Sequence, residues 1–574
     1  MRKLYSYIKP YIYTLIFAMI CKGSASVIDL LLSFLLRSVI NEGIAEANVP
    51  KIIRLCIAMV IAAVAVISLN IIGHFLSSRT SQGVGENLRN ALYARIQQMT
   101  IHNVETVTTS SLIMRVTNDV EHVQRALMMM MRFMMRAPIV AIGGTLLSLW
   151  IDPVLTLVIF LSMIILTVGS FFVYSQTRKI YQRVQKSLDR MTTILRENLE
   201  GIRVIKSFDK SGYEIGRFDE QSREVRKNEV RAGNYNAVMS PSIVLITNIT
   251  MIVILYISSF RLGLFKIEIG DVITIMTYIN MILNAMSALP RMFIMFSRAN
   301  TSADRIDEIL KIRTTTYYGE EESPADTAIT LEFSDVTFRY PNGEKPALQN
   351  INFKLARGET LAIIGETGSG KTSLLNLILR LYDPTEGEIF FQGRPISSYK
   401  KDYLTSKVTA AMQQYNIFGM SIKENIMLNI TEYDDRLQKS VKTAQLEEMV
   451  DELENGLEYM VAQNGANLSG GQKQRLSIAR TLFRNADLVV LDDVSSALDY
   501  TTDLRLRRAL RKNYRNTSVV LISQRISSVR GADQILVLKN GSMAGLGTHE
   551  YLLSNCEVYQ KICASQGVEM EVAQ

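Results

Sequence analysis

The sequence predicts a helical domain that crosses a membrane six times, followed by an α/β domain. Two observations predict this fold class. Long apolar runs are concentrated in about the first 300 residues of a 574-residue chain in which 48% of residues are hydrophobic. From residue 329 onward, short apolar strand patterns alternate with helical ones, which is typical of an α/β domain. A chain of this length is also too long for one ordinary domain.

Six segments are apolar enough to span a bilayer, which takes about 20 residues. We expect the helical domain to occupy residues 1–312, a polar linker 313–328 and the α/β domain 329–574. Since Asp152 alone separates the third span from the fourth, we expect a tight turn there. The predicted spans are 11–40, 51–76, 133–150, 153–174, 240–260 and 271–296.

The connections between these spans alternate in length and charge. The connections after the first and third spans hold no Lys or Arg, whereas residues 77–132 and 175–239 form two long basic connections. The positive-inside rule places such connections on the cytoplasmic side, so both termini are expected there as well. The protein is therefore predicted to be a multi-pass integral membrane protein in contact with the lipid bilayer.

Both long connections have the apolar periodicity of helices. Apolar residues recur at threes and fours through Val84–Met99 and Ile180–Leu199, and no proline interrupts them. At 1.5 Å per residue, the membrane helices would continue tens of ångströms beyond the bilayer. We expect the chain to turn at Thr108–Arg115 and at Ser211–Phe218.

The formal net charge of +8 raises the question of nucleic-acid binding. No tract of clustered Lys and Arg with interleaved aromatic residues is present, so the sequence favours no nucleic-acid partner. We assign the basic excess to the cytoplasmic connections.

Three polar side chains lie within the predicted spans. Asp29 lies in the first span, and Asn280 and Asn284 lie in the sixth. Because polar groups are costly at membrane depth, we expect them to face a cavity or a neighbouring helix.

A phosphate-binding motif opens the α/β domain. It follows strands expected at 330–333, 336–340 and 350–355, comes directly after an apolar strand at 361–364 and precedes an apolar helix at 373–381. The pattern is G-x-x-x-x-G-K-[ST], in which backbone N–H groups converge on phosphates at a helix N-terminus. The residues expected to bind the nucleotide are Gly365, Glu366, Thr367, Gly368, Ser369, Gly370, Lys371, Thr372 and Ser373.

A second apolar strand at 486–491 ends in Asp492. In a P-loop domain this carboxylate is the expected partner of Mg²⁺, together with the hydroxyl of Thr372, while Lys371 reaches the terminal phosphates. The sequence therefore predicts a P-loop nucleotide-binding domain that uses ATP and Mg²⁺.

Another motif narrows the class of P-loop protein. Leu468-Ser-Gly-Gly-Gln472 lies just upstream of the second strand and is followed by Lys473-Gln-Arg-Leu476. With this motif the chain resembles the ATP-binding cassette (ABC) family along almost its whole length. Six spans, two long intracellular connections and a C-terminal cassette are similar to the family's exporters. The resemblance implies a half-transporter, in a bacterial inner membrane, that must dimerise.

The resemblance also implies roles for individual residues. Tyr340 would stack on adenine, Gln413 would contact Mg²⁺ and the membrane domain, and 496–499 would form the D-loop. Two cassettes would pair head to tail, so that each ATP lies between one chain's P-loop and the other's signature motif. The signature residues expected to bind the partner's ATP are Leu468, Ser469, Gly470, Gly471 and Gln472.

Three positions depart from the family's hydrolytic pattern. The family usually has a glutamate general base after Asp492, but this chain has Asp493, whose carboxylate is set back by one methylene. The switch histidine is replaced by Gln524, which cannot carry an imidazolium charge. The glutamate usual five residues before the signature motif is Gln463.

These departures favour an asymmetric heterodimer with a second half-transporter. The intact signature motif would complete the partner's site, where most hydrolysis would occur, while this chain's degenerate P-loop site would hold ATP. We expect an ATP-hydrolysing translocase that exports small, hydrophobic, drug-like compounds. The alternatives are a homodimeric exporter of lipid or peptide and a regulatory ATP-binding subunit without transport of its own.

Overall fold

The computed structural model describes residues 2–264, 267–312, 318–325, 327–341, 343–430, 435–494 and 498–566. The chain forms two compact units. The first contains Met1–Gln97 and Val107–Ile312, and the second contains Gln98–Thr106 and Arg313–Gln574. Each unit is described by itself below.

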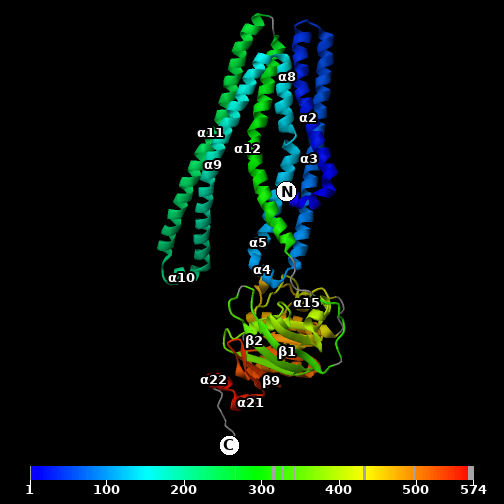
Figure 1. The fold of residues 1–574 in the computed structure, drawn as a ribbon, viewed down its shortest axis with the longest axis vertical. Coiled ribbons are helices and arrows are strands. Elements are labelled where there is room, and N and C mark those ends of the chain that lie inside the picture. The colour runs from blue at the N-terminus through cyan, green and yellow to red at the C-terminus, as the bar shows by residue number, and fades with distance from the viewer. Residues whose placement is uncertain are drawn as a thin grey trace. The chain divides into compact units, whose positions relative to one another are not determined.

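The first unit is built of helices alone in its described residues, and its longest helices run along one another (Figure 1). Its α-helices are α1 (Tyr5–Ile8), α2 (Ile12–Ser38), α3 (Val49–Gln97), α5 (Thr109–Met114), α6 (Val120–Phe133), α7 (Arg136–Pro138), α8 (Gly144–Ile151), α9 (Pro153–Glu200), α10 (Ile202–Ser207), α11 (Ser211–Gly263) and α12 (Ile269–Lys311). Short 3₁₀ or π segments join some of them at η1 (Arg2–Leu4), η2 (Lys9–Tyr11), η3 (Val39–Ile44), η4 (Arg115–Asp119) and η5 (Ile139–Gly143).

The predicted spans coincide with these helices. Within the described residues, five helical segments are long and apolar enough to cross a membrane. The fourth predicted span begins α9, whose apolar part is the shorter stretch Pro153–Gly169. The five longer segments are Tyr5–Ile44, Val49–Gln97, Thr109–Ile151, Pro241–Leu262 and Ile269–Met286.

The tight turn predicted at Asp152 is confirmed. Its carboxylate accepts hydrogen bonds from the backbone N–H groups of Val154 at 2.8 Å and Leu155 at 2.9 Å, so it caps α9. The same buried carboxylate pairs with Arg261 at 2.5 Å. An aspartate at a helix N-cap satisfies donors that the helix leaves free, which explains the abrupt start of α9.

The helices continue well past the apolar segments, as the periodicity predicts. Helices α3, α9 and α11 have 49, 48 and 53 residues, and α9 packs along α11 (Figure 1). A bilayer-spanning helix needs only about 20 residues, so more than half of each lies outside a single span.

The first predicted turn region, Thr108–Arg115, contains the turn at Thr108, whereas the second, Ser211–Phe218, is wrong. The residues from Thr109 to Met114 form α5, and Ser211 already begins α11. The chain turns at Thr108, which has a φ of 68°, and at Asp209, which has a φ of 49° and lies two residues before the second predicted region. Left-handed backbone at non-glycine residues depends on local packing and hydrogen bonds, which the apolar periodicity does not encode.

The second unit contains two β-sheets. The larger has the strand order β10-β9-β3-β8-β7-β6, in which only β10 runs antiparallel, and the smaller antiparallel sheet has the order β2-β1-β4-β5. The strands are β1 (Ile329–Phe338), β2 (Leu348–Ala356), β3 (Thr360–Gly365), β4 (Glu386–Phe391), β5 (Arg394–Pro395), β6 (Val408–Ala411), β7 (Leu488–Asp492), β8 (Ser518–Ile522), β9 (Gln534–Lys539) and β10 (Ser542–Gly547).

One strand replaces the two that were predicted at 330–333 and 336–340. Strand β1 runs through both, with an irregularity in its pairing between Phe333 and Val336. Asp335 has a φ of 49° there, so the extra residue bulges out of the ladder and the strand continues. The gap at residues 334–335 between the two predicted strands corresponds to this bulge.

Helices cover the sheets of the second unit. Buried side chains of β1, β2, β3 and α13 form one apolar cluster, and those of α18, α19 and β7 form another. The helices are α13 (Lys371–Ile378), α14 (Lys401–Lys407), α15 (Ile422–Met427), α16 (Arg436–Thr443), α17 (Glu447–Glu452), α18 (Gly470–Phe483), α19 (Tyr500–Asn513), α20 (Ile526–Val529), α21 (His549–Asn555) and α22 (Glu557–Ser565), with 3₁₀ turns η6 (Ile396–Ser398), η7 (Gly456–Glu458) and η8 (Gln463–Gly465).

A short stretch from the first long connection belongs to the second unit. The residues Gln98–Thr106 include most of α4 (Ile101–Val107). The hydroxyl of Tyr382 donates a hydrogen bond to Glu105 at 3.0 Å, and burial together with this carboxylate raises the pKa of Tyr382 to about 12. The sequence did not predict this association, since Glu105 and Tyr382 are far apart along the chain.

Candidate nucleotide-binding site

The carboxyl ends of three parallel strands meet at one edge of the larger sheet. Ile522 of β8 pairs with Asp492 of β7 on one side and with Ile363 of β3 on the other. The segments that follow β3, β7 and β8 therefore start side by side. Ligands in open α/β sheets bind at such an edge.

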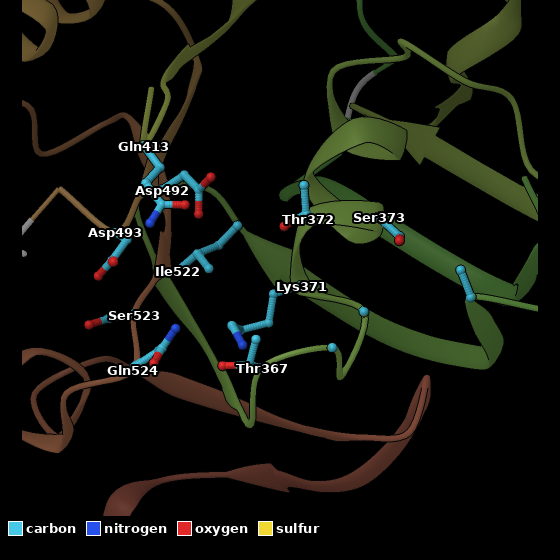
Figure 2. Close-up of a pocket in the computed structure, with 13 residues that line it drawn as sticks. Thr367, Lys371, Thr372, Ser373, Gln413, Asp492, Asp493, Ile522, Ser523 and Gln524 are labelled. Atoms are coloured by element: carbon cyan, nitrogen blue, oxygen red, sulfur yellow. The ribbon is translucent and has the colours of Figure 1, made fainter. Parts of the chain in front are cut away.

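These segments enclose a pocket of about 360 Å³ (Figure 2). It gathers most of the residues that the sequence assigns to nucleotide and magnesium binding, together with both altered hydrolytic positions. The lining residues are Ala347, Thr367, Gly368, Gly370, Lys371, Thr372, Ser373, Gln413, Asp492, Asp493, Ile522, Ser523 and Gln524.

The phosphate-binding loop has the backbone that its glycines predict. Gly368 and Gly370 have φ values of 82° and 105°, and Gly370 directly precedes α13. A Cβ on Gly370 would lie 2.7 Å from Leu348, so no larger residue fits. Ser369 carries a buried hydroxyl that has no hydrogen-bond partner among the described residues. A phosphate oxygen at the start of α13 would supply that partner, so the loop fits a nucleotide.

Lys371 is held by the loop itself. Its ammonium donates hydrogen bonds of 2.8 Å to the carbonyl oxygens of Gly365 and Glu366. Burial lowers the pKa of Lys371, and the carboxylates of Asp492 and Asp493 oppose that shift. The ammonium therefore lies among oxygen acceptors that the terminal phosphates of ATP can replace.

An oxygen-rich set of side chains occupies one wall of the pocket. Thr372, Gln413 and Asp492 all line it, and Figure 2 shows Gln413 next to Asp492. Burial and the neighbouring Asp493 raise the pKa of Asp492, while the backbone N–H of Gln413 and the charge of Lys371 lower it. A hydroxyl, an amide and a carboxylate provide the oxygen ligands that Mg²⁺ prefers, so these residues fit that ion.

The backbone of Asp493 is fixed on both sides. Its N–H donates to Ile522 O at 2.9 Å, and its carbonyl accepts a hydrogen bond from the Gln474 side chain at 3.2 Å. Its φ of 47° is uncommon for a residue with a side chain. Burial raises the pKa of Asp493, opposed by the charges of Arg525 and Lys371. The carboxylate enters the pocket from an anchored position.

Gln524 lines the opposite wall and is exposed. Its backbone carbonyl accepts a hydrogen bond from Nε2 of Gln566 at 2.6 Å, and Oε1 of Gln566 accepts a hydrogen bond from the backbone N–H of Ile526 at 2.9 Å. A residue just beyond α22 thus fastens the segment that carries Gln524.

Replacing Gln566 by alanine should loosen this segment without unfolding the domain. Loss of one hydrogen bond at the Ile526 amide lowers its local opening free energy by about 1 kcal/mol. Hydrogen exchange followed by mass spectrometry should show several-fold faster exchange in the peptide spanning Gln524–Ile526. The control is Gln560→Ala, which removes a bond to Leu553 within the C-terminal helices. Equal exchange rates of this peptide in both variants would show that Gln566 does not stabilise the segment that carries Gln524.

Tyr340 does not line the pocket. Its hydroxyl lies 3.2 Å from the Ser373 hydroxyl and accepts a hydrogen bond from Asn376 at 3.1 Å. Its ring packs edge to face against Phe338 and Tyr382, with centroid distances of 4.7 and 5.2 Å. The residue expected to stack on adenine is thus beside the helix of the phosphate-binding loop, with its hydroxyl engaged.

The signature motif lies apart from the pocket. None of its residues is among the described lining residues. Ser469 caps α18, where its backbone N–H donates to the Gln472 side chain at 2.7 Å and its hydroxyl accepts from the Gln472 N–H at 3.3 Å. Leu468 is buried, whereas Ser469 and Gly470 are exposed. An exposed helix N-terminus that offers N–H groups suits an anion brought by another molecule.

The expected D-loop is described only in part. Ser496 and Ala497 lie outside the described residues. Leu498 is buried, and Asp499 caps α19 through the backbone N–H of Thr502 at 3.0 Å.

Four residues of the site were missed by sequence reasoning. Ala347, Ile522 and Ser523 line the pocket, and Gln566 fastens one wall. Ile522 and Ser523 directly precede Gln524, so their place next to that motif position could have identified them. Ala347 and Gln566 lie in no motif. They are next to the pocket only in the folded chain.

A P-loop, a strand-end aspartate and a separate signature motif together define an ATP-binding domain of the cassette type. A family profile described as "ABC transporter" matches residues 348–496, and one described as "ABC transporter transmembrane region" matches residues 12–286. The chain belongs to the ABC transporter family. It is a multi-pass membrane protein and a subunit of an ATP-driven exporter, and half-transporters of this family dimerise.

Relatives match along the whole length. An uncharacterised ABC transporter ATP-binding protein of Bacillus subtilis, YfiB, is 33% identical over 571 residues, covering 99% of this chain and 98% of the relative. An ATP-dependent lipid A-core flippase of Haemophilus ducreyi is 28% identical over 98% of this chain and 97% of its own length. The fold is similar to that of a bacterial Atm1-family ABC exporter solved with ATP bound, with a TM-score of 0.79, 19% identity and 99% of each chain covered.

Proposed function

We propose that this chain is the ATP-holding subunit of a heterodimeric exporter that moves hydrophobic, drug-like compounds out of the cytoplasm. Its partner is a second half-transporter that carries the main hydrolytic site. Both termini face the cytoplasm, and the membrane is a bacterial cell membrane. The observation that carries the proposal is the occurrence of Asp493 and Gln524 together in one phosphate pocket.

This chain's own site gathers the groups that would bind the phosphates of ATP and Mg²⁺. The loop N–H groups and Lys371 would hold the phosphates, and Thr372, Gln413 and Asp492 would hold Mg²⁺. A bound Mg²⁺ would neutralise charge on the β- and γ-phosphate oxygens. These residues orient the nucleotide but do not by themselves activate water.

Activation of water is the step that this site performs poorly. A general base has to lie within hydrogen-bond reach of the attacking water. Asp493 is shorter than glutamate by one methylene, or about 1.5 Å. Because its N–H and its carbonyl are both bonded, the backbone cannot advance to restore that reach. Gln524 can donate a hydrogen bond to the γ-phosphate, but it adds no positive charge.

The signature motif supports the assignment of hydrolysis to the partner's site. Ser469 and Gly470 are exposed at the start of α18, outside this chain's pocket. In a head-to-tail pair they would complete the site on the partner's P-loop. ATP would then close the two cassettes, and the membrane units would change between inward and outward access, a population shift driven by nucleotide.

Comparing the chain alone with the complex tests this proposal. The purified chain should bind a fluorescent ATP analogue in the presence of Mg²⁺, and Lys371→Ala should abolish that binding. Its steady-state hydrolysis should be at least about 10²-fold slower than that of the complex with its partner, the effect expected for a misplaced general base. Hydrolysis by the chain alone at the rate of the complex would refute the heterodimer.

A further inference from the structure

The helix α22 shares a buried core with two elements that form the nucleotide pocket. Ile364 of β3 lies directly before the phosphate-binding loop, and Ile526 opens α20, two residues after Gln524. Both isoleucines belong to one apolar cluster with Tyr559 and Cys563 of α22, and all four residues are 0% exposed. A single helix therefore packs together with the strand that leads into the loop and with the segment that carries Gln524.

Gln566 joins the end of α22 to that segment by polar contacts. Its side chain spans two backbone groups, since Nε2 donates to the carbonyl of Gln524 at 2.6 Å and Oε1 accepts from the N–H of Ile526 at 2.9 Å. The N–H groups in the first turn of a helix have no partner within it, and Arg525, the residue before α20, provides no side-chain cap. Gln566 therefore supplies the cap that α20 lacks.

The remainder of α20 is held by a different helix. Arg507 of α19 donates hydrogen bonds to the backbone carbonyls of Ser527 at 2.9 Å and Ser528 at 3.0 Å. Asp503, which is 6% exposed, accepts a hydrogen bond from the same guanidinium at 2.6 Å. Because these bonds do not involve Gln566, its loss should free the entry to α20 while the helix itself stays in place.

The end of α22 is itself well anchored. Tyr559 is fully buried, and its hydroxyl lies 2.7 Å from Nδ1 of His549 on α21. The backbone N–H of Gln566 donates to the carbonyl of Cys563 at 3.1 Å. The side chain of Gln566 therefore extends from an ordered backbone, so little conformational entropy is lost when it binds the segment.

Gln524 is the residue that this arrangement positions. Its backbone carbonyl is bonded to Gln566, and its exposed side chain lines the pocket (Figure 2). ATP differs from ADP by the γ-phosphate alone, and a glutamine amide can donate a hydrogen bond to a phosphate oxygen. If the segment occupied this position only part of the time, the affinity for ATP would fall in proportion to that fraction.

We propose that Gln566 is a positioning residue which, through Gln524, makes this pocket bind ATP in preference to ADP. By linkage, a bound γ-phosphate should in turn stabilise the hydrogen bonds between Gln566 and residues 524–526. This role goes beyond the proposed function, and it does not depend on which chain hydrolyses ATP. The end of α22 is thereby coupled to the nucleotide in the pocket.

The test compares two nucleotides on the complete purified chain in nanodiscs with Mg²⁺. A fluorescent nucleotide is displaced either by ADP or by a triphosphate with nitrogen in place of the β–γ bridging oxygen, which is not hydrolysed. Gln566→Ala should weaken binding of the triphosphate about fivefold, as expected for a lost hydrogen bond, and leave binding of ADP unchanged. Gln566→Glu should have the same selective effect, because its carboxylate would repel the carbonyl of Gln524.

Two further variants separate positioning from folding. Gln560→Ala removes a bond to Leu553 within the C-terminal helices and should alter neither affinity. Gln524→Ala should itself weaken triphosphate binding, and adding Gln566→Ala should cause no further loss, since residues that act through one another are not additive. Equal weakening of both nucleotides, additive losses or an unchanged triphosphate affinity in Gln566→Ala would each overturn the proposal.

Hydrogen exchange gives an independent readout of the linkage. In the unaltered chain, the peptide that spans residues 524–526 should exchange several-fold more slowly with the triphosphate than with ADP. Gln566→Ala should remove most of this difference. Equal protection of the peptide by both nucleotides in the unaltered chain would show that the γ-phosphate does not act on the contact with Gln566.

Discussion

Changing Asp493 to glutamate and Gln524 to histidine together should restore hydrolysis at this chain's own site. The expected gain is on the order of 10²–10⁴-fold, the contribution of a well-placed general base. Because the backbone of Asp493 is bonded to Ile522 and Gln474, an added methylene can extend only into the pocket. The histidine would add a hydrogen-bond donor that can also carry charge beside the γ-phosphate.

This gain should be measured in a complex whose partner has lost its own general base. Steady-state release of phosphate then reports this chain's site alone. Asp493→Gln with the same histidine is the matched control, because glutamine has the length of glutamate without its charge. A control as active as the glutamate variant would show that reach, rather than basicity, limits the site. Fast hydrolysis with the original Asp493 would contradict the assignment of a holding site.

Substituting Gly470 by aspartate should abolish ATP hydrolysis by the complex, with a loss of about 10²–10³-fold, as for removal of a transition-state donor. The new carboxylate would face the partner's γ-phosphate and repel it. The substitution should be tolerated by the fold, since a Cβ there meets only the Tyr415 hydroxyl at 3.6 Å and an acidic residue suits the start of α18.

Comparing the ATP hydrolysis rate of the Gly470→Asp complex with that of a complex altered in this chain's own P-loop distinguishes the roles of the two sites. Lys371→Ala removes ATP from the holding site and should lower the rate of the complex far less than Gly470→Asp. Gly531→Asp is the charge-matched control, because its Cβ would meet only Arg511 at 3.8 Å in an exposed turn. Thermal unfolding of the three complexes verifies that each is intact. If Lys371→Ala abolished hydrolysis and Gly470→Asp did not, the roles of the two sites would be reversed.

The nucleotide pocket shows which parts of a site local sequence can predict. The phosphate loop, Asp492 and Ser469 lie in contiguous motifs whose backbone conformation depends on neighbouring residues, so their local structure follows from the sequence. Gln566 contacts Gln524 across 42 positions, and Glu105 contacts Tyr382 across 277. Contacts of this kind depend on the complete fold and leave no local pattern.

The turns show a second limit. Helical periodicity predicts that α3 and α9 extend beyond the membrane, but it does not predict the residues at which they end. Thr108 and Asp209 adopt left-handed backbone conformations that few non-glycine residues prefer, and surrounding contacts hold them there. The first predicted region therefore contains its turn only at its first residue, and the second begins two residues after the turn at Asp209.

By itself the sequence determined the order of the two domains, the apolar spans, the phosphate-binding loop and the altered residues at 493 and 524. Apolar length, periodicity and motif spacing are local properties, so they can be read along the chain. Tertiary structure alone decided that the backbone of Asp493 is hydrogen-bonded on both sides and that Gln566 is hydrogen-bonded to the segment that carries Gln524. Both depend on groups that distant helices and strands bring within a few ångströms, and such proximity arises only when the chain is folded.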